Sequence, residues 1–264
     1  MNRVTRILEE RREAGRGSLM PFFVGGFPVG VPTGDLLLAV QEGGGHIAEV
    51  GIPFSDPIAD GPVIASAMHT ALQAGVTPDA VFDDIARVRD RLSMGVVCMV
   101  SASIVARDGD IDAFIRRAVE RGVDGFIFPD ITLEESAPYR TAAANAGATC
   151  SLLIAPTTPD ERAAAIANAC TGFAYLIARK GITGTSDAMP DIGGRVGALR
   201  RATETPIAAG FGIAEPEHIR AVLEHADAAI VGSAIVGKLA GTTPAAACQT
   251  VADEVARLAA GMPA

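Results

Sequence analysis

The 264-residue sequence contains no tryptophan, two tyrosines and only two lysines, Lys180 and Lys238. Acidic residues outnumber basic ones by 31 to 22, so the net charge is -9 and the pI is about 4.9. An acidic chain without a basic stripe argues against nucleic acid or an anionic membrane as a partner. A small anionic substrate is still compatible with this charge, because backbone N–H groups can bind a phosphate locally.

Cysteine and histidine are sparse and scattered. The four cysteines show no C-x-x-C spacing, which indicates neither a zinc site nor a disulfide framework. We interpret Cys98, Cys150 and Cys170 as small core residues, and His46 as a capping or core residue. The four histidines do not cluster, so we expect no metal and no other cofactor.

Long apolar runs are also missing. No segment has 18 uninterrupted apolar residues, and the first fifteen residues are charged and amphipathic. We therefore expect no membrane span, no signal peptide and a cytoplasmic location.

Short apolar runs alternate with longer amphipathic segments along the whole sequence. This alternation predicts an α/β fold, a single (β/α)₈ TIM barrel over residues 1–264, since one such barrel needs about 250 residues. An open doubly wound sheet uses the same alternation, but the count of strands and the length favour the barrel. The predicted strands are 19–24, 47–50, 96–101, 125–128, 150–154, 173–177, 206–208 and 228–231, and helices are predicted at 111–121, 134–146, 159–169 and 216–225.

Two further segments depart from the repeating pattern. An extra helix over residues 4–12 precedes the first strand, and we expect it to plug the bottom of the barrel. Residues 180–194 are rich in Gly, Thr, Ser and Asp and are long for a barrel connection, which is typical of a functional lid.

The most informative motif is Glu49-Val-Gly-Ile-Pro-Phe-Ser-Asp-Pro-Ile-Ala-Asp-Gly-Pro62. It begins where the second strand ends, at the face of the barrel that carries active sites. Its acids could be solvated loop residues, and Asp60 could simply cap the next helix. Glu49 weakens that interpretation, because an unpaired carboxylate at the end of an apolar strand costs free energy unless it has a task.

This motif closely resembles the signature of the tryptophan synthase alpha chain family. The resemblance extends along the chain through Pro21-Phe22, Glu135-Ser136-Ala137-Pro138, Gly181-Ile-Thr-Gly184, Gly210-Phe-Gly-Ile213 and Gly232-Ser-Ala-Ile235. It implies a lyase that cleaves indole-3-glycerol phosphate to indole and glyceraldehyde 3-phosphate in tryptophan biosynthesis.

The resemblance also implies roles for individual residues. Glu49 is expected to be the acid–base residue, Asp60 to face the indole nitrogen, and Tyr175 to lie close to both. The expected indole pocket comprises Phe22, Ile64, Ser101, Ile127 and Phe211, the expected lid residues are Arg179 and Thr183, and Ser55, Asp56 and Pro57 are expected to face a tryptophan synthase beta subunit in an alpha2-beta2 heterotetramer.

A phosphate site can be predicted from the glycines themselves. Gly184, Gly212 and Gly232 follow the sixth, seventh and eighth strands, whose C-terminal ends are neighbours in a closed barrel. Ser233 begins a short helix, and a helix N-terminus favours a negative charge. Any one of these glycines could instead belong to an ordinary tight turn.

Several positions depart from the family pattern. Val24 stands in place of the usual threonine after the first strand, and Ile131-Thr132 replace the prolines expected near Asp130, which is kept. The third strand of the family usually ends in Tyr-x-Asn, where this sequence has Ser101 and Ser103. The serines predict a wider and more polar pocket with fewer contacts to a beta subunit. Three alternatives therefore stay open: a stand-alone lyase that feeds another pathway, a non-catalytic regulatory paralogue, and a phosphosugar isomerase barrel that shares only the phosphate loops.

Overall fold

The structure is a computed structural model, and it describes residues 1–57, 60–178, 192–210 and 212–263. The strands are all parallel and follow the order β5-β4-β3-β2-β1-β9-β8-β7-β6. They are β1 (Ser18–Val24), β2 (Ile47–Gly51), β3 (Gly95–Met99), β4 (Gly125–Ile127), β5 (Thr149–Ser151), β6 (Leu153–Ile154), β7 (Ala174–Ile177), β8 (Ile207–Gly210) and β9 (Ala228–Val231).

The two end strands of this order, β5 and β6, are separated only by Leu152 and together correspond to the predicted fifth strand. The backbone N–H of Leu152 donates to Cys170 Sγ at 3.2 Å, while its carbonyl accepts from the Tyr175 N–H at 3.1 Å. The Leu152 N–H takes no part in strand pairing, but β5 still pairs with β4 and β6 still pairs with β7. The order therefore closes into the predicted eight-stranded TIM barrel.

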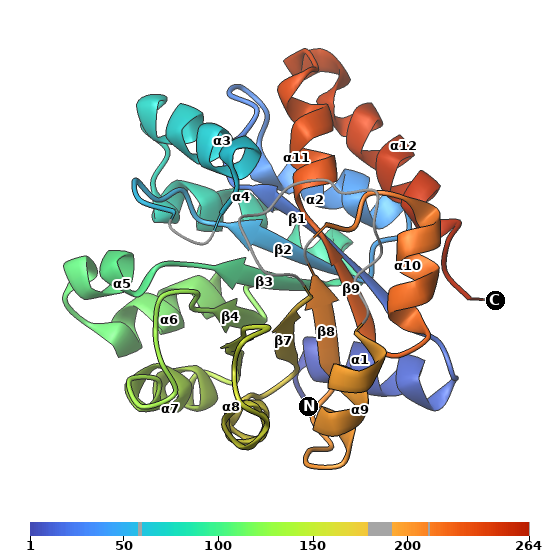
Figure 1. Ribbon diagram of the computed structural model, residues 1–264. Coiled ribbons are helices and arrows are strands. Elements are labelled where there is room, and N and C mark those ends of the chain that lie inside the picture. The colour runs from blue at the N-terminus through green and yellow to red at the C-terminus, as the bar shows by residue number, and fades with distance from the viewer. Residues whose placement is uncertain (58–59, 179–191, 211, 264) are drawn as a thin grey trace.

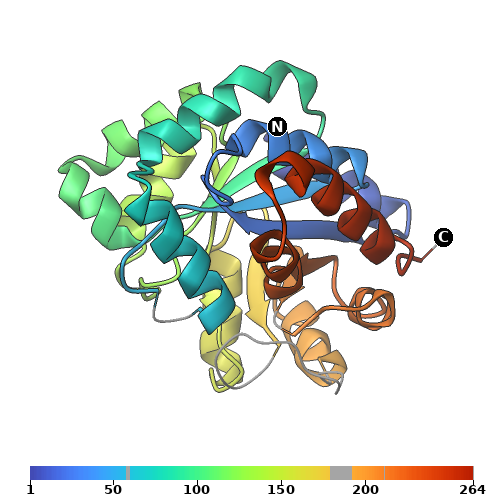
Figure 2. The same ribbon diagram turned by 90° about the horizontal axis from the view of Figure 1, so that it is seen from above.

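Helices cover the outside of the ring of strands, except for the first helix, which closes its lower end (Figures 1 and 2). They are α1 (Arg3–Glu13), α2 (Thr33–Glu42), α3 (Pro62–Gln73), α4 (Pro78–Val88), α5 (Ala102–Asp108), α6 (Ile111–Glu120), α7 (Ala137–Asn145), α8 (Asp160–Ala169), α9 (Gly193–Arg200), α10 (Pro216–Leu223), α11 (Ser233–Ala240) and α12 (Ala247–Ala259), with short 3-10 turns at Arg89–Arg91 and Pro244–Ala246. Among the described residues, no helix is long and apolar enough to cross a membrane.

Several predicted boundaries were wrong, and at two of them a side chain binds the backbone. The third strand ends at Met99 rather than at residue 101, since Ser101 is the N-cap of α5 and accepts from the Ser103 N–H. Helix α7 begins at Ala137 rather than at residue 134, since Glu135 accepts from the backbone N–H and the hydroxyl of Thr132 in a turn.

The interior of the barrel is filled from below by α1, as predicted. Val4 and Leu8 of this helix are almost fully buried in one cluster with side chains that point inward from the strands, among them Met20 and Val97. The Asn2 side chain caps α1 through the Val4 N–H and donates to the carbonyls of Asp124 and Gly147. A second and larger cluster lies between the outer faces of the strands and the surrounding helices.

The cysteines and His46 occupy the structural roles predicted for them. Cys98, Cys150 and Cys170 are buried, and burial raises the pKa of the Cys150 and Cys170 thiols to about 12. His46 Nδ1 accepts the N–H of Leu19 at 3.1 Å. Burial, and then the positive charge of Arg11, lower the pKa of His46 to about 4, so the ring is neutral at neutral pH.

Candidate active site

Glu49 lies on β2 with its carboxyl inside the barrel. In the strand register it is opposite Phe22 of β1 and Val97 of β3. Its side chain points to the same face as that of Ile47, two residues earlier, which belongs to the interior cluster. Placed near the carboxyl end of the strand, the group sits at the upper end of the packed interior, where barrel active sites form.

The Glu49 side chain is fully buried, and neither carboxyl oxygen has a hydrogen-bond partner among the described residues. Burial raises the pKa of Glu49 to about 8, and the negative charge of Asp60 adds to this effect. Glu49 is therefore protonated at neutral pH and can donate a proton to a group that enters the barrel mouth.

Asp60 lies immediately before the N-cap of α3. The cap residue is Gly61, which has no side chain of its own to cap the helix. Asp60 is therefore not the helix cap that the motif alone allowed. Burial raises the pKa of Asp60 to about 6, so the group is largely ionised at neutral pH, unlike Glu49.

Tyr175 completes this group of ionisable side chains from the opposite wall. It lies on β7, between Leu153 of β6 and Ala208 of β8. Burial, followed by the charges of Glu49 and Asp60, raises its pKa well above the ordinary value for a tyrosine. The structure thus brings the three predicted catalytic residues together: one protonated acid, one carboxylate and one neutral hydroxyl.

The described part of the predicted phosphate site lies over β8 and β9, which are hydrogen-bonded neighbours. Gly212 adopts a φ of +79°, which is open to glycine and strained for other residues. Gly232 is the N-cap of α11, and its carbonyl accepts the first helical bond from the Val236 N–H. The N–H groups of the first turn, including that of Ser233, are therefore not used within the helix and can bind an anion. Gly184 lies outside the described residues.

The predicted indole-pocket residues fall into three places. Phe22 and Ile64 pack against Gly232, where an added Cβ would lie 3.2 Å from Phe22 Cδ1 and 3.6 Å from Ile64 Cδ1. Ile127 is fully buried in the interior cluster that also contains Tyr175. Ser101 lines a cavity on the other side of Asp60. Phe211 and the predicted lid residues Arg179 and Thr183 lie outside the described residues.

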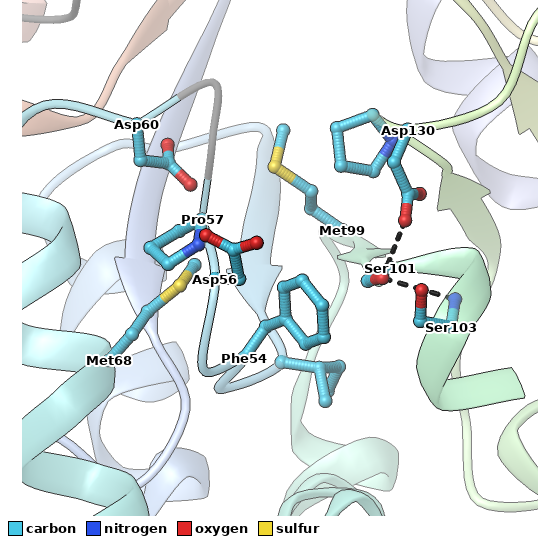
Figure 3. Close-up of a pocket in the computed structure, with 11 residues that line it drawn as sticks. Phe54, Asp56, Pro57, Asp60, Met68, Met99, Ser101, Ser103 and Asp130 are labelled. Atoms are coloured by element: carbon cyan, nitrogen blue, oxygen red, sulfur yellow. Dashed lines mark hydrogen bonds between the residues drawn. The ribbon is translucent and has the colours of Figure 1, made fainter. Parts of the chain in front are cut away.

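The cavity next to Asp60 has a volume of about 480 Å³ (Figure 3). The motif residues Asp56, Pro57 and Asp60 line it together with Ser101 and Ser103. Sequence reasoning missed the rest of its lining, which consists of Ile52, Phe54, Met68, Met99, Pro129 and Asp130. Residues 52 and 54 lie inside the recognised motif, and only the fold brings residues 99, 129 and 130 to the same place.

The predicted partner-facing residues lie at the outer side of this cavity. Ser55 and Asp56 are exposed and Pro57 is half-buried. Among the described residues, no cluster of His, Cys, Asp and Glu side chains could hold a metal ion.

The family model and the related sequences that match this chain all belong to one family. The family model described as tryptophan synthase alpha chain matches residues 8–262. The tryptophan synthase alpha chain of Synechococcus sp. (strain CC9902) is 39% identical over 237 residues, which are 89% of this chain and 88% of that relative. That of Burkholderia mallei (strain NCTC 10229) is 38% identical over 264 residues, 99% of this chain and 97% of the relative.

Solved structures agree with this result. The crystal structure of tryptophan synthase subunit alpha from Legionella pneumophila has a TM-score of 0.87 at 29% identity, and the match covers 99% of this chain and 98% of that one. A tryptophan synthase structure from M. tuberculosis, in its aminoacrylate-bound form, has a TM-score of 0.86 at 28% identity, with 99% of both chains covered.

Proposed function

Because the chain belongs to the tryptophan synthase alpha chain family, we propose how its own residues carry out the reaction. The chain is a lyase of tryptophan biosynthesis that cleaves indole-3-glycerol phosphate to indole and glyceraldehyde 3-phosphate. The observation that carries the residue assignment is the buried Glu49 carboxyl, which lacks a hydrogen-bond partner among the described residues and interacts with Asp60.

Glu49 supplies the proton that makes the carbon–carbon bond breakable. An intact indole is a poor acceptor for the electron pair of that bond, whereas protonation at C3 gives an indolenine cation that accepts it. With a pKa of about 8, Glu49 carries the required proton at neutral pH. The resulting carboxylate then takes the proton of the glycerol hydroxyl as the bond breaks and the aldehyde forms.

Asp60 stabilises the positive charge that develops on the indole ring. It is ionised at neutral pH and lies on the same side of the barrel mouth as Glu49, so its carboxylate can accept the indole N–H. Tyr175 keeps its proton and offers a neutral donor from the wall opposite the two acids. The different pKa values of Glu49 and Asp60 thereby separate the role of acid from that of stabilising anion.

The phosphate is bound away from the acids by backbone groups. The first turn of α11 and the Gly212 turn provide N–H groups, and Phe22 and Ile64 lie between this region and the barrel interior. Ser233→Asp is expected to raise KM for the substrate by like-charge repulsion. An unchanged KM would mean that the phosphate lies elsewhere.

Members of this family act with a beta subunit, and we propose that this chain docks one through the exposed loop Ser55-Asp56-Pro57 in an alpha2-beta2 heterotetramer. Asp56→Lys is expected to weaken activation by added beta subunit. The charge-matched control Asp112→Lys, on the exposed face of α6, is expected to leave it unchanged. Equal activation of both variants would remove the loop from the interface.

The test of the reaction is indole release from indole-3-glycerol phosphate, measured with the chain alone and with a tryptophan synthase beta subunit. We expect slow release that rises steeply with beta subunit; fast release without it would indicate the stand-alone lyase. Glu49→Gln is expected to abolish turnover while phosphate-ligand affinity stays within a few-fold, and Glu120→Gln, an exposed change on α6, serves as control. Retained turnover in Glu49→Gln would remove Glu49 from its assigned role, whereas no indole release by the wild type, with or without the beta subunit, would support the regulatory paralogue.

We extend the proposal to the domain organisation and the location of the protein. The described strands belong to one continuous sheet order, which supports a single domain over residues 1–264. The biosynthetic role supports a cytoplasmic location.

A further inference from the structure

The 480 Å³ cavity extends from Asp60 to Asp130, and these two carboxylates face each other across it (Figure 3). Its volume lies within the range of roughly 300–1,000 Å³ that is typical of pockets for small organic ligands. The walls between the two acids are apolar and include Phe54, Met68 and Met99. The space therefore suits a flat apolar ring with Asp60 at one edge and Asp130 at the other.

At the end of the cavity near Asp130, the Asp130 carboxylate and the Ser101 hydroxyl act as hydrogen-bond acceptors toward a ligand. The Ser101 hydroxyl donates its single proton to Asp130 Oδ2 at 2.5 Å, and its oxygen accepts the Ser103 N–H at 3.1 Å. Asp130 Oδ1 accepts the Ala102 N–H at 2.9 Å. A carboxylate has about four acceptor sites, so these bonds leave Asp130 able to accept further protons, while Ser101 has none left to give.

The charge of the described lining also favours a ligand group that donates a hydrogen bond. The lining residues that the structure describes include three aspartates and, among themselves, no lysine, arginine or histidine. A hydroxyl or an amine can donate to the Asp130 carboxylate, whereas an anionic group next to it would meet like charge.

We propose that this cavity is a subsite for an indole that carries a hydrogen-bond donor on its benzenoid ring, so that amino- or hydroxy-substituted indole-3-glycerol phosphates are substrates. The proposal rests on the proposed function, in which Asp60 faces the indole N–H. With the nitrogen at Asp60, ring atom C5 is the atom farthest from the nitrogen. A donor on C5 then points away from Asp60 and toward Ser101 and Asp130 at the opposite edge of the cavity.

The experiment uses the reverse reaction, in which indole C3 bonds to the aldehyde carbon, the aldehyde oxygen gains a proton and C3 loses one. We would measure kcat/KM with glyceraldehyde 3-phosphate for indoles bearing an amino, hydroxyl, methyl or carboxylate group at C5. A hydrogen bond to a charged group contributes about 1.5–3 kcal/mol, which corresponds to about tenfold or more. The amino and hydroxy compounds should thus exceed the methyl compound about tenfold, and the carboxylate should fall well below it.

Two variants test whether the Asp130 carboxylate causes the preference for the amino compound over the methyl compound. Asp130→Asn should reduce the amino-to-methyl ratio at least threefold and relax the rejection of the carboxylate, whereas Ser101→Ala, which keeps the Asp130 charge, should retain both. Because each ratio compares two indoles with the same variant, a general loss of activity in that variant does not affect it. Asp112→Asn, an exposed change outside the cavity, is the charge-matched control and should leave both ratios at the wild-type values.

Binding of 5-aminoindole and 5-methylindole, measured by calorimetry in parallel, separates this proposal from the reaction. Turnover of indole with equal kcat/KM for the amino and methyl compounds would overturn the subsite and leave the lyase intact. Tighter binding of the amino compound without turnover of any indole would support the subsite and overturn the lyase assignment. Equal binding without turnover would overturn both.

Discussion

Asp60 adds its negative charge to the burial that raises the pKa of Glu49 to about 8, while its own pKa is raised only to about 6. The difference follows from their places in the fold. Glu49 is enclosed on a barrel strand, whereas Asp60 lines a cavity that opens to solvent at Asp56. Between about pH 6 and pH 8, Glu49 is therefore protonated while Asp60 is ionised, although both face one substrate.

This arrangement predicts a bell-shaped dependence of kcat/KM on pH. Activity should rise as Asp60 ionises near pH 6 and fall as Glu49 loses its proton near pH 8. Asp60→Asn should remove the acid limb and move the alkaline limb to lower pH, because a negative charge beside Glu49 is gone. The profile is measured with saturating glyceraldehyde 3-phosphate in the reverse reaction; an alkaline limb that Asp60→Asn leaves in place would contradict the coupling.

The same burial predicts that Glu49 reduces the stability of the fold at alkaline pH. Its pKa is near 4.5 when unfolded and about 8 when folded, so the folded state binds the extra proton between these values. The free energy of unfolding contributed by this group therefore falls as pH rises from about 4.5 to 8. Glu49→Gln, which cannot ionise, should be more stable than wild type at pH 9, by on the order of a few kcal/mol.

Near pH 4 the two proteins should unfold at similar denaturant concentrations, since Glu49 is protonated in both states there. Urea unfolding of wild type and Glu49→Gln at the two pH values tests this prediction, with Glu120→Gln as the exposed control. A Glu49→Gln variant that is less stable than wild type at pH 9 would mean that the ionised carboxylate has a stabilising partner in the folded state.

How much of this could be predicted from the sequence depends on whether the information is local. The strand 228–231 was predicted at its observed bounds, since a short apolar run between a helix and a Gly-Ser turn leaves no alternative. The end of the third strand was missed because Ser101 reads as part of an apolar run until its hydroxyl is seen to cap α5 and to bind Asp130.

The candidate site divides in the same way. Glu49 and Asp60 belong to one continuous motif and could be assigned together, and the resemblance added Tyr175 from a distant strand. Asp130 could not be assigned to a cavity, because its contact with Ser101 joins two loops 29 residues apart and exists only once β3 and β4 pair in register.

Gly210 is predicted to keep Tyr175 in place. An added Cβ at this position would lie 2.9 Å from the Tyr175 hydroxyl and 3.1 Å from Ile230 Cβ, so one neighbour must move. Gly210→Ala should therefore lower kcat at least tenfold, because displacements of about 1 Å in an active site cost up to a hundredfold. The control is Gly197→Ala in α9, where the nearest atom is 3.9 Å away.

Gly197→Ala should leave kcat unchanged and stabilise the protein by about 0.5–1 kcal/mol, as expected for glycine within a helix. Steady-state kinetics and urea unfolding of the two variants give both quantities. Full activity of Gly210→Ala would show that Tyr175 tolerates displacement and would weaken its assignment to the catalytic group.

Asp227 should stabilise the bottom of the barrel more than any exposed ion pair. Its buried carboxylate accepts the Ile207 N–H at 2.7 Å and an Arg200 N–H at 3.0 Å, and it lies 3.8 Å from Arg12 at the end of α1. Asp227→Ala leaves a buried N–H unpaired and removes the anion of Arg200 and one of the two anions near Arg12, so it should lower the free energy of unfolding by about 3 kcal/mol. Glu204→Ala removes the other, 95% exposed partner of Arg12 and should cost less than about 0.5 kcal/mol. If the two variants unfold at the same urea concentration, the contact between Arg12 and Asp227 contributes nothing to the attachment of α1.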